Sequence, residues 1–234
     1  MAGPPQRSWL LRRAESALRR GFQRAYETVR VDPQQYLSHL QAAHRLPVSS
    51  FQDMESLPME QLDLLAAQTI RAGMKMAAVE GAGFGLAGVV SLLPDLGILA
   101  AITLRTVQKL SLIYGFEYNT DEEVAELWTA AASAAGVDIG RELVERQIVN
   151  KFVPRVIERI AARASAEVVE KWSARVIPLA GSILGAGLNY YFVRAWGERA
   201  RKHFRERHLA LRRQRAERVR PAGQTLPPQR TLRD

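Results

Sequence analysis

Residues 81–104 read GAGFGLAGVVSLLPDLGILAAITL and carry one charged side chain, Asp95, directly after Pro94. A membrane-spanning helix needs about 20 mostly apolar residues. The two charge-free runs, Gly81–Pro94 and Leu96–Leu104, are each shorter than that. Joining them would place a carboxylate and a helix-breaking proline in the middle of the bilayer, which is costly. Three alternatives stay open: buried helices of a soluble body, a hairpin dipping into one leaflet, or a true span. In the hairpin, Pro94 and Asp95 would lie at the apex.

A second apolar stretch, VIPLAGSILGAGLNYYFV, covers Val176–Val193 and is bordered by an arginine on each side. Pro178, three glycines and Asn189 make its transfer into lipid less favourable than that of a leucine-rich span. Both stretches contain the GxxxG spacing, at Gly81–Gly85 and Gly181–Gly185. Glycine in a helix interior costs about 1 kcal/mol relative to alanine. The spacing favours close crossing of two helices, and a glycine-lined hairpin able to enter lipid is the alternative.

Helix signals cover the rest of the chain, and strand signals are scarce. Apolar residues recur at three- and four-residue intervals from Leu11 to Val29, which predicts a helix with one apolar stripe. Asp32–Pro33 is typical of a helix start, and TDEE from Thr120 to Glu123 of a capping box. We predict an all-α fold, a single helical domain, with helices near residues 8–30, 33–44, 58–91, 95–115, 121–135, 138–150, 154–175 and 178–220. Pro58, Pro154 and Pro178 are expected to open three of them.

Positive charge is concentrated at the two ends of this 234-residue chain. Residues 1–30 hold seven arginines and two glutamates, a net charge of +5. Residues 194–234 hold thirteen bases and four acids, a net charge of +9, and the segment 31–193 between them has a net charge of −5. We divide the chain into a basic N-terminal segment (1–57), a helical domain (58–207) and a basic, largely disordered tail (208–234). This distribution indicates attraction to a polyanion, either phospholipid or nucleic acid.

The basic ends also contain aromatic residues, as helices that lie on membrane surfaces do. We expect Trp9, Phe22, Trp196 and Phe204 to add apolar contacts to the attraction between the bases and anionic lipid. The residues expected to bind lipid or another anion are Arg12, Arg13, Arg19, Arg20, Arg201, Lys202, Arg205, Arg212 and Arg213. A plain solvated helix end and a nucleic-acid site are the alternatives, although no recognised nucleic-acid-binding module is present.

The sequence holds few candidates for catalysis. There is no cysteine, which fits a reducing intracellular compartment and excludes thiolate metal sites. The histidines lack the spacing of a helical zinc site, and no nucleophile or phosphate-loop motif occurs. We therefore predict no metal and no cofactor. Glu80 and Asp95 could form a carboxylate site, as in a hydrolase of lipids or peptides, but helix capping is the preferred role for Asp95. Asn189 is interpreted as an interhelical hydrogen-bonding residue.

The same apolar segments resemble those of the EcsC family of bacterial proteins over about residues 60–207. The resemblance rests on a glycine-rich segment, a Pro/Asp turn, a helix ending in Tyr-Gly-Phe and a late segment with an IP-x-x-G pattern. The matching residues are Gly81, Gly83, Gly88, Pro94, Asp95, Tyr114, Gly115, Phe116, Ile177, Pro178, Gly181 and Asn189. The family is named after a gene beside an ABC-transporter operon. The resemblance implies a shared fold, a bacterial origin and a transporter or other membrane protein as a candidate partner, and it transfers no catalytic residue.

These observations predict a non-enzymatic helical protein attached to a membrane. Its basic ends would hold it on the anionic inner face of the cytoplasmic membrane, because short basic flanks resist translocation. Its apolar segments would either pack against each other or dip into lipid. Two alternatives are retained: a soluble hydrolase with a site near Glu80 and Asp95, and a basic nucleic-acid-binding protein.

Overall fold

The computed structural model describes residues 4–84, 92–139, 149–173 and 181–219. These residues form seven α-helices, one short 3₁₀ helix and no strand, which confirms the all-α prediction. In chain order the elements are α1 (Pro4–Thr28), α2 (Pro33–His44), η1 (Gln52–Ser56), α3 (Met59–Phe84), α4 (Leu92–Ile113), α5 (Asp121–Ala134), α7 (Val149–Ser173) and α8 (Gly181–Val219).

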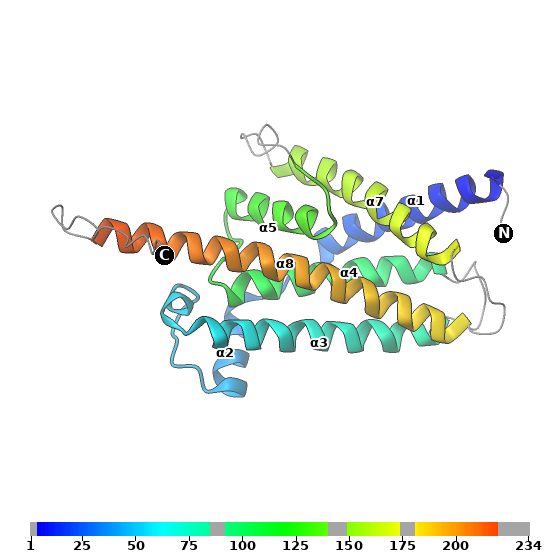
Figure 1. The fold of residues 1–234 in the computed structure, drawn as a ribbon. Coiled ribbons are helices and arrows are strands. Elements are labelled where there is room, and N and C mark those ends of the chain that lie inside the picture. Colours follow the sequence, from blue (N-terminus) through cyan, green and yellow to red (C-terminus); the bar gives the residue numbers. More distant parts are fainter. Residues whose placement is uncertain (1–3, 85–91, 140–148, 174–180, 220–234) are drawn as a thin grey trace, which may run out of the picture.

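The long helix α8 organises the packing. It contacts α3, α4 and α5 along its length, and its C-terminal part extends beyond the other helices (Figure 1). On the other side of the core, α1 packs against α4 and α7. The N-terminal segment therefore shares one core with the helices that follow it. The helix α8 also continues to Val219, past the domain boundary that the sequence suggests at residue 207.

Local signals in the sequence explain where several helices begin and end. The Asp32 carboxylate accepts a hydrogen bond from the Gln35 backbone N–H at 2.9 Å, and a proline follows Asp32 at the first helical position of α2. The capping box predicted at the start of α5 is confirmed. The helix α4 ends at Ile113, and Gly115 follows with a φ of 84°, in the left-handed region that glycine adopts without strain. There the Phe116 N–H donates to the Ser111 carbonyl, as in a Schellman motif.

Two prolines lie inside helices rather than at the positions that we predicted for them. We predicted that Pro94 separates a helix near 58–91 from one near 95–115, but α4 begins at Leu92, so Pro94 lies in its first turn. A proline costs no hydrogen bond there, because the first N–H groups of a helix have no helical acceptor. Pro154 lies inside α7, which begins at Val149, instead of opening a helix. The helix predicted at 138–150 and the start predicted at Pro178 fall mainly on residues 140–148 and 174–180, outside the described residues.

The described part of the opening stretch belongs to the core of the protein. Among the described helices, one segment, Leu96–Ile113 in α4, is long and apolar enough to cross a membrane by length and composition. It is 72% buried within the protein. Leu96, Leu99 and Leu104 are each less than 5% exposed. From Leu96 onward the stretch is therefore packed as a helix of the bundle, and residues 85–91 lie outside the described residues.

Candidate functional site

The outward face of α1 carries a row of exposed arginines. Positions 12, 13, 19, 20 and 24 fall on one side of a helix with 3.6 residues per turn, and all five side chains are exposed. Within the described residues, no carboxylate forms an ion pair with any of them. The Arg13 guanidinium lies 4.8 Å from the centre of the Trp9 ring, and Trp9 is 42% exposed. The row offers several unneutralised charges beside one aromatic side chain.

The opposite face of α1 explains why these arginines point outward. Ala14, Leu18, Phe22 and Ala25 are each at most 5% exposed, and they face α4 and α7. A helix that buries one apolar stripe must turn its polar residues to the solvent.

The predicted anion-binding residues of the C-terminal end are placed differently, because two of the five contact other segments of the chain and two more pair with glutamates of α8. The Arg205 Nε lies 2.9 Å from an Asp63 carboxylate oxygen of α3. Arg212 donates to the Leu57 carbonyl oxygen at 2.5 Å. Arg201 and Lys202 lie near glutamates on α8 itself, at 2.9 and 3.9 Å.

The neighbouring arginines of α8 follow the same pattern. Arg207 pairs with Glu126 of α5 at 2.6 Å, and Arg215 pairs with Glu55 of η1. These contacts join α8 to distant segments of the chain. Of the predicted C-terminal residues, Arg213 is exposed and has no partner among the described residues. Much of the positive charge at this end is therefore neutralised by carboxylates of the same chain.

Three of the four aromatic residues expected at the surface are buried, which corrects that expectation. Phe22 and Trp196 stack with ring centres 5.8 Å apart, and they are 2% and 3% exposed. Phe204 is 1% exposed and stacks on Phe116. Each belongs to the apolar side of its helix, which the core covers completely. Trp9 alone of the four can reach a surface.

One end of the bundle brings the basic and the apolar segments together. There α1 and α8 begin, α3 and α7 end, and α4 begins (Figure 1). Gly73 of α3 lies against Val193 of α8, so the last turns of α3 adjoin the first turns of α8. Nearby apolar side chains are unusually exposed: Val79 of α3 at 74% and Tyr190 of α8 at 41%. The helix that carries the exposed arginines therefore begins at the same end of the bundle as this exposed apolar surface, and basic residues beside apolar ones are typical of interfacial surfaces.

Other residues that the sequence singled out lie along the same helices. Glu80, Gly81 and Gly83 are in the last turns of α3, Pro94 and Asp95 are in the first turn of α4, and Gly181 begins α8. The structure does not describe the side-chain surroundings of these residues. Gly88, Ile177 and Pro178 lie outside the described residues altogether. Asn189 is 3% exposed and makes an interaction within the protein. In the described part of the chain, no group of three His, Asp or Glu side chains is arranged to hold a metal ion.

The Tyr-Gly-Phe segment forms a structural junction that the sequence did not reveal. The Tyr114 hydroxyl donates to the Asp63 carboxylate at 2.7 Å, and Asp63 also accepts from Arg205. Burial and this carboxylate raise the pKa of Tyr114 well above its usual value. The His208 Nδ1–H donates to the Tyr114 carbonyl oxygen at 2.8 Å. The contacts link positions 51 to 142 residues apart, so no local pattern could have indicated them.

Comparisons with known proteins bear on the same region. A sequence model described as the EcsC protein family matches residues 14–209, so the match begins within α1. The chain is 29% identical over 162 residues to "Protein EcsC" of Bacillus subtilis (strain 168), covering 67% of this chain and 68% of that protein. It is 22% identical over 158 residues to "Uncharacterized protein YdbA" of the same bacterium, covering 62% of this chain and 58%, less than two thirds, of that protein. No solved structure matches the chain significantly.

Proposed function

This chain belongs to the EcsC protein family, and we propose that it acts, without being an enzyme, as a peripheral protein of an anionic membrane surface. The bundle end where α1 begins would face the lipid. Two observations carry this proposal: the exposed, unpaired arginine row of α1 with the exposed Trp9, and the exposed apolar residues Val79 and Tyr190 of α3 and α8. The start of α1, the end of α3 and the start of α8 lie at the same end of the bundle (Figure 1). The cytoplasmic face is the proposed location, because its leaflet carries a negative surface potential.

The charges on α1 suffice for reversible attachment. Each arginine near an anionic surface contributes about 1 kcal/mol. Arg12, Arg13, Arg19 and Arg20 together would contribute about 4 kcal/mol, close to a thousandfold in affinity. This part of the attraction weakens with salt, because charges more than about 8 Å apart are screened at physiological ionic strength. Burial of Trp9 and of neighbouring apolar side chains would add a part that salt does not remove.

Flotation with lipid vesicles tests the proposal. We expect the full-length protein to float with vesicles that contain phosphatidylglycerol and much less with vesicles of phosphatidylcholine alone. Replacing Arg12, Arg13, Arg19 and Arg20 by glutamine should weaken binding to the anionic vesicles at least tenfold. Trp9→Ala should weaken the binding that remains at high salt. Substitution is preferred to deletion of α1, because Leu18 and Phe22 of that helix belong to the core.

A matched variant removes the same charge at the other end of the chain. It carries glutamine in place of Arg213, Arg218, Arg230 and Arg233, and we expect it to float nearly as well as the unchanged protein. Equal losses in the two variants would mean that net charge, and not the α1 face, governs binding. Undiminished flotation of the α1 variant would also refute the proposal, and thermal melting of each variant shows whether it remains folded.

A further inference from the structure

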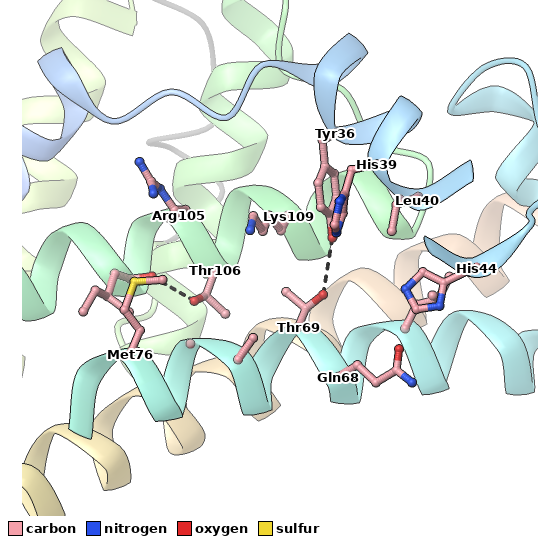
Figure 2. Close-up of a pocket in the computed structure, with 14 residues that line it drawn as sticks. Tyr36, His39, Leu40, His44, Gln68, Thr69, Met76, Arg105, Thr106 and Lys109 are labelled. Carbon is pink, nitrogen blue, oxygen red and sulfur yellow. Dashed lines mark hydrogen bonds between the residues drawn. The ribbon is translucent and has the colours of Figure 1, made fainter. Parts of the chain in front are cut away.

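A cavity of about 210 Å³ lies between α2, α3 and α4, and it is lined by residues of all three helices (Figure 2). Its inner wall is largely apolar and buried, with Leu40, Leu65 and Ile102 among the lining residues. Exposed residues of α2 and α4 form its rim. A mostly apolar concavity with a few convergent polar groups is the usual form of a small-molecule site.

Two cations, Arg105 and Lys109, line the cavity, and no carboxylate does. The other ionisable residues of the lining are His39, His44 and Tyr36. Within the described residues, no acidic side chain forms an ion pair with either cation of α4. A cleft lined by one sign of charge attracts ligands of the opposite sign.

Arg105 and Lys109 are one helical turn apart on α4 and both line the cavity. Like charges at this spacing repel each other, which destabilises the helix slightly. Burial and the Arg105 charge both lower the pKa of Lys109. The Lys109 ammonium lies 5.3 Å from the centre of the Tyr36 ring, which provides weak compensation at most. An anion between the two bases would relieve this repulsion.

A second polar feature of the cavity points to a ligand with a hydrogen-bond donor. The Gln68 side-chain oxygen is buried and has no hydrogen-bond partner among the described residues. The hydroxyls nearby are already engaged with other groups: Tyr36 with Thr69 at 3.3 Å, and Thr106 with the Ile102 carbonyl at 2.8 Å. Buried acceptors without a partner are rare in native proteins and call for an explanation. A ligand hydroxyl would satisfy this one.

We propose that this cavity binds a small phosphate monoester that also carries a hydroxyl group. The phosphate would lie between Arg105 and Lys109, and the hydroxyl would donate to Gln68. A phosphate monoester near pH 7 carries between one and two negative charges, so it matches two neighbouring cations better than a carboxylate does. Arginine and lysine are the side chains that most often bind phosphate. Glycerol 3-phosphate has this chemistry, and so has the headgroup of a lysophosphatidic acid.

Isothermal titration of the full-length protein with glycerol 3-phosphate tests the proposal, with methyl phosphate as the analogue that lacks a hydroxyl. We expect glycerol 3-phosphate to bind more tightly than methyl phosphate. Lys109→Gln and Arg105→Gln should each weaken binding at least tenfold. Arg71→Gln is the matched control, because Arg71 is exposed on α3 and does not line the cavity. Gln68→Leu should reduce glycerol 3-phosphate binding to the level of methyl phosphate.

Three results would overturn the proposal: no binding of glycerol 3-phosphate at millimolar concentration, equal affinity for both phosphates in the unchanged protein, or an equal loss in Arg71→Gln and Lys109→Gln. Thermal melting shows whether each variant is folded, and the exposed Arg105 provides a second test if Lys109→Gln is not. Titration with hexanoyl lysophosphatidic acid then identifies the source of the ligand. Tighter binding of this lipid assigns the cavity to a lipid headgroup, and tighter binding of glycerol 3-phosphate assigns it to a free metabolite.

Discussion

Gly21 and Gly97 face each other where α1 crosses α4, and we predict that they differ sharply in their tolerance of alanine. A Cβ atom on Gly21 would lie 2.8 Å from the Gly97 Cα and 3.2 Å from the Ala100 Cβ. The first of these atoms belongs to a helix backbone, so α4 as a whole would have to move. A Cβ atom on Gly97 would lie 4.0 Å from the Gly21 Cα, an ordinary van der Waals distance.

Both substitutions gain the same helix propensity, and they differ in how the new methyl group packs against the facing helix. Alanine is about 1 kcal/mol better than glycine in a helix interior. Gly97→Ala should keep most of that gain, because the methyl group meets no close atom. Gly21→Ala adds an overpacking cost that we place in the upper part of the usual range, at about 2–3 kcal/mol, because a backbone must shift. We therefore expect Gly97→Ala to be stabilising by up to about 1 kcal/mol and Gly21→Ala to be destabilising by about 1–2 kcal/mol.

Thermal melting measures both effects. For a chain of this size, 1 kcal/mol corresponds to about 2–4 °C in Tm. Gly21→Ala should lower Tm by about 2–8 °C, and Gly97→Ala should raise it by about 1–4 °C. If Gly21→Ala melts at or above the temperature of the unchanged protein, α1 and α4 do not cross as closely as the structure indicates. If both variants lose stability equally, the argument from Cβ direction fails.

Further predictions concern the Tyr114 junction, the pH dependence and a cap. Asp63→Ala should cost about 2–3 kcal/mol in urea unfolding, because the buried Tyr114 hydroxyl loses its acceptor. Tyr114→Phe, which leaves Arg205 paired with Asp63, should cost about 1 kcal/mol. Equal losses of stability in Asp63→Ala and Tyr114→Phe would contradict a network in which Asp63 holds both Tyr114 and Arg205. Burial lowers the pKa of His208, so its contribution to stability is present above its unfolded pKa of about 6.5 and is lost as the pH falls. Melting curves between about pH 7.5 and 5 should show this loss, and His208→Gln should show a smaller one. Thr120→Ala should cost about 1 kcal/mol, and an unchanged urea midpoint would refute its capping role.

The helical character of the protein could be predicted from the sequence because its signals are local. The cap at Asp32, the capping box at Thr120 and the glycine turn after α4 each depend on residues within one or two turns. The prolines were harder to interpret. Pro94 and Pro154 both lie inside helices. A proline near a helix start is compatible with more than one register, so the sequence did not determine where these helices begin.

The charge pattern shows what only the tertiary structure decides. The sequence contains two arginine-rich ends of similar appearance, and both suggested lipid binding. In the folded chain the α1 arginines stay exposed, whereas Arg205 and Arg207 of α8 meet Asp63 and Glu126. The cavity between α2, α3 and α4 likewise takes its walls from three helices, and no single segment carries its pattern. Helix formation depends on neighbours along the chain, but the charges that remain free depend on partners brought together from distant segments, and packing alone selects those partners.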